Sequence, residues 1–107
     1  MLRAVIVEDE KKSQDTLIAM LNRYCHQVDV VGVAEGVESG LKTIPKLQPD
    51  ILFLDIQMPD GSGFKLLELL GDRTFQVIFI TAFDQYAIKA IRYSALDYLL
   101  KPIIPDE

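Results

Sequence analysis

The stretch ILFLDIQMPDGSG, residues 51–63, runs from four apolar residues directly into a carboxylate and then into a turn. A buried apolar strand is an unfavourable environment for an acid, so Asp55 at its end needs a reason. Pro, Asp and Gly at residues 59–61 indicate a turn, because Pro presets its φ and Gly tolerates conformations that other residues avoid. The stretch therefore predicts a rigid strand over residues 51–54 that presents an acid next to an open loop.

The rest of the chain alternates between strand and helix patterns. Short, apolar segments rich in β-branched residues predict strands at residues 3–7, 28–33, 51–54, 76–80 and 97–100. Their nearly continuous apolarity is typical of strands covered on both faces. The intervening segments have helical spacing, marked by Leu17/Leu21/Tyr24, Val37/Leu41/Ile44, Phe64/Leu67/Leu70 and Ala87/Ala90/Ile91, and Pro45 should end or kink the second helix. This alternation predicts a doubly wound α/β domain with a parallel sheet.

Composition narrows the class of protein. A chain of 107 residues, half of them hydrophobic, fits one domain with a real core. The formal net charge is −5 and Lys and Arg do not cluster, so this chain by itself should bind neither nucleic acid nor a membrane surface. A single cysteine excludes a disulfide framework and a cysteine metal site. Without a membrane-length apolar run or a signal-peptide pattern, we expect a cytoplasmic protein.

Chemically distinctive residues gather at the predicted strand ends, where folds of this class bind ligands. They are Glu8 and Asp9, Asp55, Thr81, and Lys101. Three converging carboxylates would raise one another's pKa, and an oxygen-only set with room for water suits Mg²⁺. Lys101 suits a phosphate group, and an Asp carboxylate can accept a phosphoryl group. Each residue alone could be a helix cap or a solvated charge, but together they favour a Mg²⁺-dependent phosphoryl site.

With these residues in view, the chain resembles the response-regulator receiver domains of two-component signalling over residues 3–102. The matching segments are VIVEDE (5–10), LFLDIQMPDGSG (52–63), FITA (79–82) and DYLLKP (97–102). The resemblance implies a flavodoxin-like, five-stranded parallel sheet with strand order 2-1-3-4-5. It also implies phosphorelay signal transduction with Mg²⁺ as the cofactor.

The resemblance further implies a role for each matching residue. Asp55 is the phosphoacceptor, and Asp9, Asp55 and the main-chain carbonyl of Gln57 bind the metal, with Glu8 acting behind them or through water. Residues that bind the phosphoryl group or respond to it are Thr81, Ala82, Lys101 and Tyr98. A cis peptide bond precedes Pro102. The fourth helix supplies the output surface, with Tyr86, Lys89, Arg92 and Tyr93, although its tyrosines are more often packing residues.

A longer segment points to a subfamily and to partners. TAFDQYAIKAIRYSALDYLLKP (81–102) resembles receivers joined to DNA-binding domains of the LytTR type, the LytR/AlgR group. It implies a sensor histidine kinase as the phosphoryl donor and transcription regulation through a DNA-binding domain that is absent from this chain. Apart from self-phosphorylation and self-dephosphorylation, we expect no enzymatic activity.

The resembled family continues into a fifth helix after the Lys-Pro pair, whereas this sequence stops at IIPDE (103–107). We therefore expect residues 1–107 to form a receiver domain truncated after the fifth strand, with the fifth helix missing and no output domain. Apolar side chains among residues 77–80, 99–100 and 103–104 would then lack cover. Such a patch predicts a homodimer or other self-association.

Three other functions fit these residues less well. A haloacid-dehalogenase-like phosphohydrolase needs a second Asp two positions after the nucleophile, and Gln57 cannot donate a proton as that acid does. An FMN-binding flavodoxin needs a loop rich in hydroxyls and Gly where this chain has VEDE (7–10). A pseudo-receiver, which binds partners without phosphorylation, would not need the full set of acids, Thr81 and Lys101.

Overall fold

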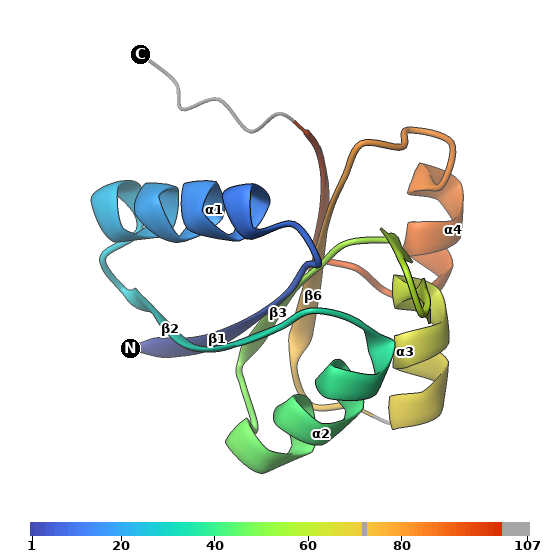
Figure 1. Cartoon of the computed structure of the whole chain (residues 1–107), viewed down its shortest axis with the longest axis horizontal. Helices are drawn as coiled ribbons and strands as arrows, with labels where there is room; N and C mark the ends of the chain where they lie inside the picture. Colours follow the sequence, from blue (N-terminus) through green and yellow to red (C-terminus); the bar gives the residue numbers. More distant parts are fainter. Residues whose placement is uncertain (72, 102–107) are drawn as a thin grey trace.

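A five-stranded parallel sheet forms the middle layer of the computed structural model, which describes residues 1–71 and 73–101 (Figure 1). Its strands are β1 (Leu2–Val7), β2 (Val28–Ala34), β3 (Ile51–Leu54), β6 (Gln76–Thr81) and β7 (Asp97–Leu100). Their spatial order is β2-β1-β3-β6-β7. Because β6 and β7 are the fourth and fifth strands of the predicted set, this order confirms the predicted flavodoxin-like 2-1-3-4-5 sheet.

The helices cover the sheet unequally. α1 (Lys11–Tyr24) lies on one face, and α2 (Val37–Leu47), α3 (Gly63–Leu70) and α4 (Ala87–Arg92) lie on the other (Figure 1). Side chains alternate along the strands, so Ala4 and Ile6 of β1 pack toward α1 while Val5 and Val7 pack toward α2 and α3. For β3 and most of β1, the near-continuous apolarity thus has the predicted cause, burial on both faces, whereas β7 is largely exposed.

Three details of the helices differ from the predictions. α2 continues to Leu47, two residues beyond Pro45, so the proline lies within the last turn of the helix rather than at its end. Tyr24 and Ile91 continue the apolar spacing of their helices but are 52% and 74% exposed. Of the predicted positions, α1 buries Leu17 and Leu21, and the short α4 buries only Ala90.

A hairpin that the sequence did not predict follows β3. β4 (Gln57–Met58) and β5 (Gly61–Ser62) pair in antiparallel fashion, with Gln57 opposite Ser62 and Met58 opposite Gly61. The predicted turn at residues 59–61 is its tip, and Gly61 has a φ of +143°, which L side chains rarely adopt. The loop beside Asp55 is therefore an ordered element.

The α1 face of the sheet has open apolar surface near β6 and β7. Ile80 and Leu99 are neighbours in the β6–β7 register, and Leu99 is 38% exposed. A cavity of about 370 Å³ beside α1 is lined partly by Ile6, Leu17 and Phe53. The expected self-association through this face stays a prediction, and residues 103–104, which were expected to add to it, lie outside the described residues.

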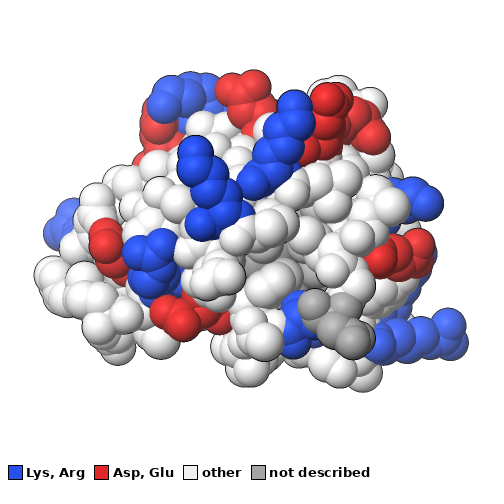
Figure 2. All heavy atoms as spheres, turned by 90° about the horizontal axis from the view of Figure 1, so that it is seen from below, with Lys and Arg blue, Asp and Glu red and all other residues white. Residues whose placement is uncertain are grey.

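One face of the molecule carries charged side chains of both signs (Figure 2). Figure 2 shows acidic and basic side chains interspersed over the face seen there. Within residues 1–71 and 73–101, each helix is too short or too polar to cross a lipid bilayer.

The core predicts a stability difference that can be measured. Phe79 is fully buried, with its ring centroid 5.0 Å from that of Phe64 and 6.1 Å from that of Tyr98. Phe79→Ala should lower the free energy of unfolding in urea by about 3–5 kcal/mol, because it leaves a cavity. Ile91→Ala, at an exposed position, should change it by no more than about 0.5 kcal/mol. Similar losses in the two variants would contradict this assignment of the core.

Candidate functional site

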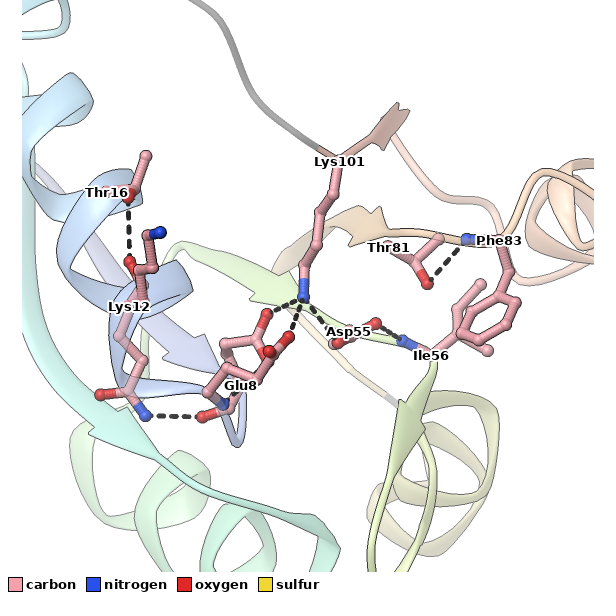
Figure 3. A network of polar contacts seen from close by, with 10 residues as sticks. Glu8, Lys12, Thr16, Asp55, Ile56, Thr81, Phe83 and Lys101 are labelled. Carbon is pink, nitrogen blue, oxygen red and sulfur yellow. Dashed lines mark hydrogen bonds and ion pairs between the residues drawn. The ribbon is translucent and has the colours of Figure 1, made fainter.

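Side chains from four strand ends converge on one rim of the sheet (Figure 3). Glu8 and Asp9 follow β1, Asp55 follows β3, Thr81 is the last residue of β6, and Lys101 follows β7. The view shows the Lys101 side chain pointing down between Glu8 and Asp55, with Thr81 on the other side of Asp55. The residues predicted from strand ends therefore lie together.

The three acids form a compact cluster. One carboxylate oxygen each from Glu8, Asp9 and Asp55 lies within 4.8 Å of the other two. Glu8 and Asp55 are 5% and 6% exposed, whereas Asp9 is more open to solvent. Oxygen ligands with one open side are what Mg²⁺ prefers, because it keeps several of its waters. The residues present thus fit the predicted cofactor.

Lys101 supplies the counter-charge within this cluster. Its Nζ lies 3.0 Å from Asp55 Oδ2, forms an ion pair with Glu8 Oε1, and is 3.4 Å from Glu10 Oε1. Burial is the largest single influence and would lower the pKa of the Lys101 ammonium, but the hydrogen bonds to Glu8 and Asp55 and the charges of these two acids together raise it. Lys101 is therefore a fixed positive charge at neutral pH.

Glu8 is the acid whose protonation the site changes most clearly. Burial raises its pKa to about 7, against the opposing effects of Lys101 and of the Glu10 N–H that its carboxylate accepts. The charge of Asp55 raises it further but contributes less than burial. Mutual repulsion of the acids was predicted to raise their pKa values, and for Glu8 the direction is right while the larger cause is desolvation.

Asp55 is held in one orientation by its neighbours. Its Oδ1 accepts the Ile56 N–H at 2.7 Å, and its own N–H donates to the Val7 carbonyl at 3.0 Å. The Gly63 N–H donates to the Ile56 carbonyl at 2.7 Å. A Cβ at Gly63 would lie 2.4 Å from the Asp55 carbonyl oxygen, so only glycine lets α3 start this close to the acid.

The remaining predicted phosphate-binding and switch residues lie on the β6 side. Thr81 is fully buried, and its Oγ1 accepts the Phe83 N–H at 3.4 Å, while Ala82 is exposed and lines the same cavity as Asp55 and Lys101. Tyr98 lies inward: its ring packs near Phe79, and its hydroxyl donates to the Phe83 carbonyl. Pro102, with its predicted cis bond, lies outside the described residues.

Of the predicted output residues on and beside α4, three contact the Phe64 ring of α3 and one does not. Tyr86 and Tyr93 are half-buried, with ring centroids 6.1 Å and 5.1 Å from that of Phe64 in α3, and the Lys89 ammonium lies 4.7 Å from the same ring. Arg92 is exposed. The large apolar side chains that α4 exposes are instead Ile88 and Ile91, each 74% exposed. The two tyrosines thus attach α4 to α3.

Two polar contacts near the site were not predicted. The Gln57 side-chain amide donates to the Tyr86 hydroxyl at 3.2 Å, which joins the hairpin to the start of α4. The Asp60 carboxylate accepts the Val37 N–H at 2.8 Å and the Glu38 N–H at 3.0 Å, at the start of α2. One sequence signal could have suggested the second contact: Gly36, just before α2, has no side chain with which to cap that helix.

Comparison with known proteins agrees with this geometry. The family described as "Response regulator receiver domain" matches residues 4–107. Similar curated proteins include the transcriptional regulatory protein BtsR of Escherichia coli (strain K12), 41% identical over 96% of this chain and 43% of that protein. The sensory transduction protein LytT of Bacillus anthracis is also 41% identical, over 95% of this chain and 42% of that protein. The chain thus spans less than half the length of these two relatives.

A solved structure has the same fold. The response regulatory domain of protein mrkE from Klebsiella pneumoniae superposes with a TM-score of 0.86 at 31% sequence identity. The match covers 96% of this chain and 85% of that one.

The ion pairs of Lys101 predict a stability effect that depends on metal. Lys101→Met removes the counter-charge from Glu8 and Asp55, whose side chains are each 7% exposed. Without metal, the free energy of unfolding should fall by about 3–5 kcal/mol, the cost of leaving a buried ion pair without one partner. Mg²⁺ should restore part of this loss, because it supplies positive charge at the same carboxylates.

A surface ion pair provides the control. Lys11 contacts Asp15 at 3.1 Å, and their side chains are 81% and 59% exposed. Lys11→Met should therefore change the unfolding free energy by less than about 1 kcal/mol, with or without Mg²⁺. Urea titrations of both variants give the comparison, and a Lys101→Met protein that Mg²⁺ does not stabilise would contradict the assignment.

Proposed function

The chain belongs to the response regulator receiver domain family, and from that premise we propose that it accepts a phosphoryl group on Asp55 from a sensor histidine kinase, with Mg²⁺ as cofactor. One observation carries the proposal. The Lys101 ammonium lies 3.0 Å from Asp55 Oδ2, inside a cluster of carboxylates whose oxygens lie within 4.8 Å of one another. The residues proposed as nucleophile, phosphate-binding cation and metal ligands thus lie within contact distance of one another.

The proposed step is a phosphoryl transfer. A carboxylate oxygen of Asp55 attacks phosphorus and forms a P–O bond, the P–N bond of a phosphohistidine donor breaks, and the histidine keeps the electron pair. With acetyl phosphate, the broken bond is P–O and acetate leaves. When bound, Mg²⁺ would offset the negative charge of the carboxylates and of the phosphoryl oxygens. Asp9, Asp55 and the Gln57 carbonyl would hold the metal, with Glu8 behind them or through water.

The chain's own residues prepare Asp55 for this step. The Ile56 N–H and the Lys101 ammonium each bind one of its oxygens, at 2.7 Å and 3.0 Å, which fixes the carboxylate plane while each oxygen keeps a second lone pair. Lys101 would then stabilise charge on the transferred group. The Thr81 hydroxyl and the Ala82 N–H would donate to its oxygens.

The proposed output is regulation of transcription. BtsR, a relative more than twice as long as the matched segment, is named a transcriptional regulatory protein. By analogy, phosphorylation of this chain would act in the cytoplasm through a DNA-binding domain outside residues 1–107. The chain would be a phosphoryl acceptor that loses the group again, rather than an enzyme that turns over external phosphate esters.

Phosphorylation can be tested by intact mass. Incubated with acetyl phosphate and Mg²⁺, the protein should gain the mass of one phosphoryl group. Asp55→Asn should gain none, and Asp9→Ala should gain far less because a metal ligand is lost. Labelling of Asp55→Asn to the wild-type level would overturn the proposal. A chromogenic phosphate ester, added in parallel, should not be hydrolysed continuously.

A second prediction concerns transmission to α4. Thr81 Oγ1 accepts the Phe83 N–H, and the Phe83 carbonyl accepts the hydroxyl of Tyr98 in β7. A movement of the Thr81 hydroxyl can therefore reach β7 through Phe83 alone. Beryllium fluoride with Mg²⁺, which mimics the phosphoryl group, should therefore shift NMR amide signals over residues 84–100. In Thr81→Ala, the shifts should shrink toward the residues around Asp55. Wild-type shifts confined to the acidic site would contradict this path.

A further inference from the structure

The N-terminus of α2 is capped by a residue from another part of the chain. Its N-cap residue is Gly36, which has no side chain to accept the first N–H groups of the helix. Asp60, at the tip of the hairpin, accepts two of them: Oδ1 binds the Val37 N–H at 2.8 Å and Oδ2 binds the Glu38 N–H at 3.0 Å. These hydrogen bonds, first that of Glu38 and then that of Val37, lower the pKa of Asp60. Both of its oxygens are thus engaged by the helix.

The contact between the hairpin and α2 is sterically tight. A Cβ at Gly36 would lie 2.5 Å from Asp60 Oδ1. Gly36 has an extended backbone, with a φ of −173°, that any residue can adopt, so a side chain there would disturb the Asp60 carboxylate rather than strain the backbone. A Cβ at Gly61, beside Asp60, would lie 3.1 Å from Val37 Cγ2.

This contact joins the two sides of the acidic site. On one side, the hairpin carries Gln57. Gly63, which directly follows the hairpin, donates its N–H to the carbonyl of Ile56, which directly precedes it, at 2.7 Å. On the other side, the Glu8 N–H donates to the Ala34 carbonyl at 2.9 Å, and Ala34 ends β2 just before α2. Asp60 therefore fixes the hairpin against the connection between β2 and α2, which lies beside Glu8.

We propose that Asp60 is a positioning residue for the metal site: by holding the hairpin against α2, it fixes the main chain of Gln57 for its contact with Mg²⁺. This inference rests on the proposed function, because it takes Gln57 as a metal ligand. Asp60 itself is not one of the three clustered acids, and its oxygens accept the α2 amides. Partners that orient the ligands of a metal commonly decide how tightly the metal binds.

The test compares two variants that loosen this contact with one that does not. Asp60→Ala removes the carboxylate, and Gly36→Ala keeps it but displaces it with a methyl group. The matched control is Ser39→Ala: Ser39 Oγ accepts the Glu35 and Gly36 N–H groups at 3.0 Å and 3.1 Å, so it supports the same end of α2 from within the helix. Mg²⁺ binding is measured by calorimetry on the unphosphorylated protein, without a phosphoryl donor.

We expect the Kd for Mg²⁺ to rise about tenfold in Asp60→Ala and in Gly36→Ala, the lower end of what loss of a contact to a metal ligand costs. Ser39→Ala should bind Mg²⁺ like the wild type, and Asp60→Asn, which keeps one acceptor oxygen, should lie between wild type and Asp60→Ala. Hydrogen exchange in metal-free protein gives a second readout. The main-chain amide hydrogens within residues 57–62, where Pro59 has none, should exchange faster in Asp60→Ala than in the wild type. In Ser39→Ala their exchange rates should be unchanged.

The outcomes separate this inference from the function on which it rests. If the wild type binds Mg²⁺ and is phosphorylated, but Asp60→Ala and Ser39→Ala bind Mg²⁺ equally well, Asp60 only stabilises α2 and the inference is wrong. If the wild type binds Mg²⁺ but is never phosphorylated, the proposed function fails, and the Kd comparison still decides the role of Asp60. A wild type that binds no Mg²⁺ overturns both.

Discussion

Buried negative charge at the carboxyl ends of β1 and β3 is the constraint on which the arrangement of this domain depends. Glu8 and Asp55 come from neighbouring strands and are almost fully buried, so each needs a compensating positive charge. Lys101 provides it from β7, on the far side of β6. The main-chain N–H of Lys101 donates to the Thr81 carbonyl at 2.8 Å, and the Lys101 side chain reaches past the end of β6 to the acids. The long aliphatic stem of lysine is what makes this possible.

The same constraint explains why the neighbouring loops are ordered. A buried acid that pairs with a cation from another strand keeps one direction, and the loop after β3 is fixed at several points. Gly63 lets α3 begin beside Asp55, Gln57 joins the hairpin to Tyr86, and Asp60 joins it to α2. α4 is in turn attached to α3 through Tyr93, whose hydroxyl donates to Glu68 at 2.6 Å. The surroundings of Asp55 and the surface of α4 are thus connected through one set of contacts.

Much of this architecture could be predicted from the sequence, because apolar strands and polar strand ends are local patterns. Asp55, Thr81 and Lys101 follow runs of apolar residues, and a parallel sheet brings such ends together. The contacts that were missed depend on the path of loops in space. Asp60 caps a helix that starts 23 residues earlier, and no spacing rule relates these positions. The exposure of Ile91 was missed for a similar reason, since helical periodicity shows a face but not its neighbour.

The close approach of Gly36 and Asp60 also constrains how this sequence can diverge. Any side chain at position 36 would collide with the carboxylate, which would lie 2.5 Å from its Cβ, while the backbone there would accept every residue type. Loss of the acid at position 60 would relax the steric demand for glycine, whereas loss of the glycine first would displace the acid. The residue types at the two positions are therefore coupled: an acid at position 60 can cap α2 in this geometry only while position 36 has no side chain.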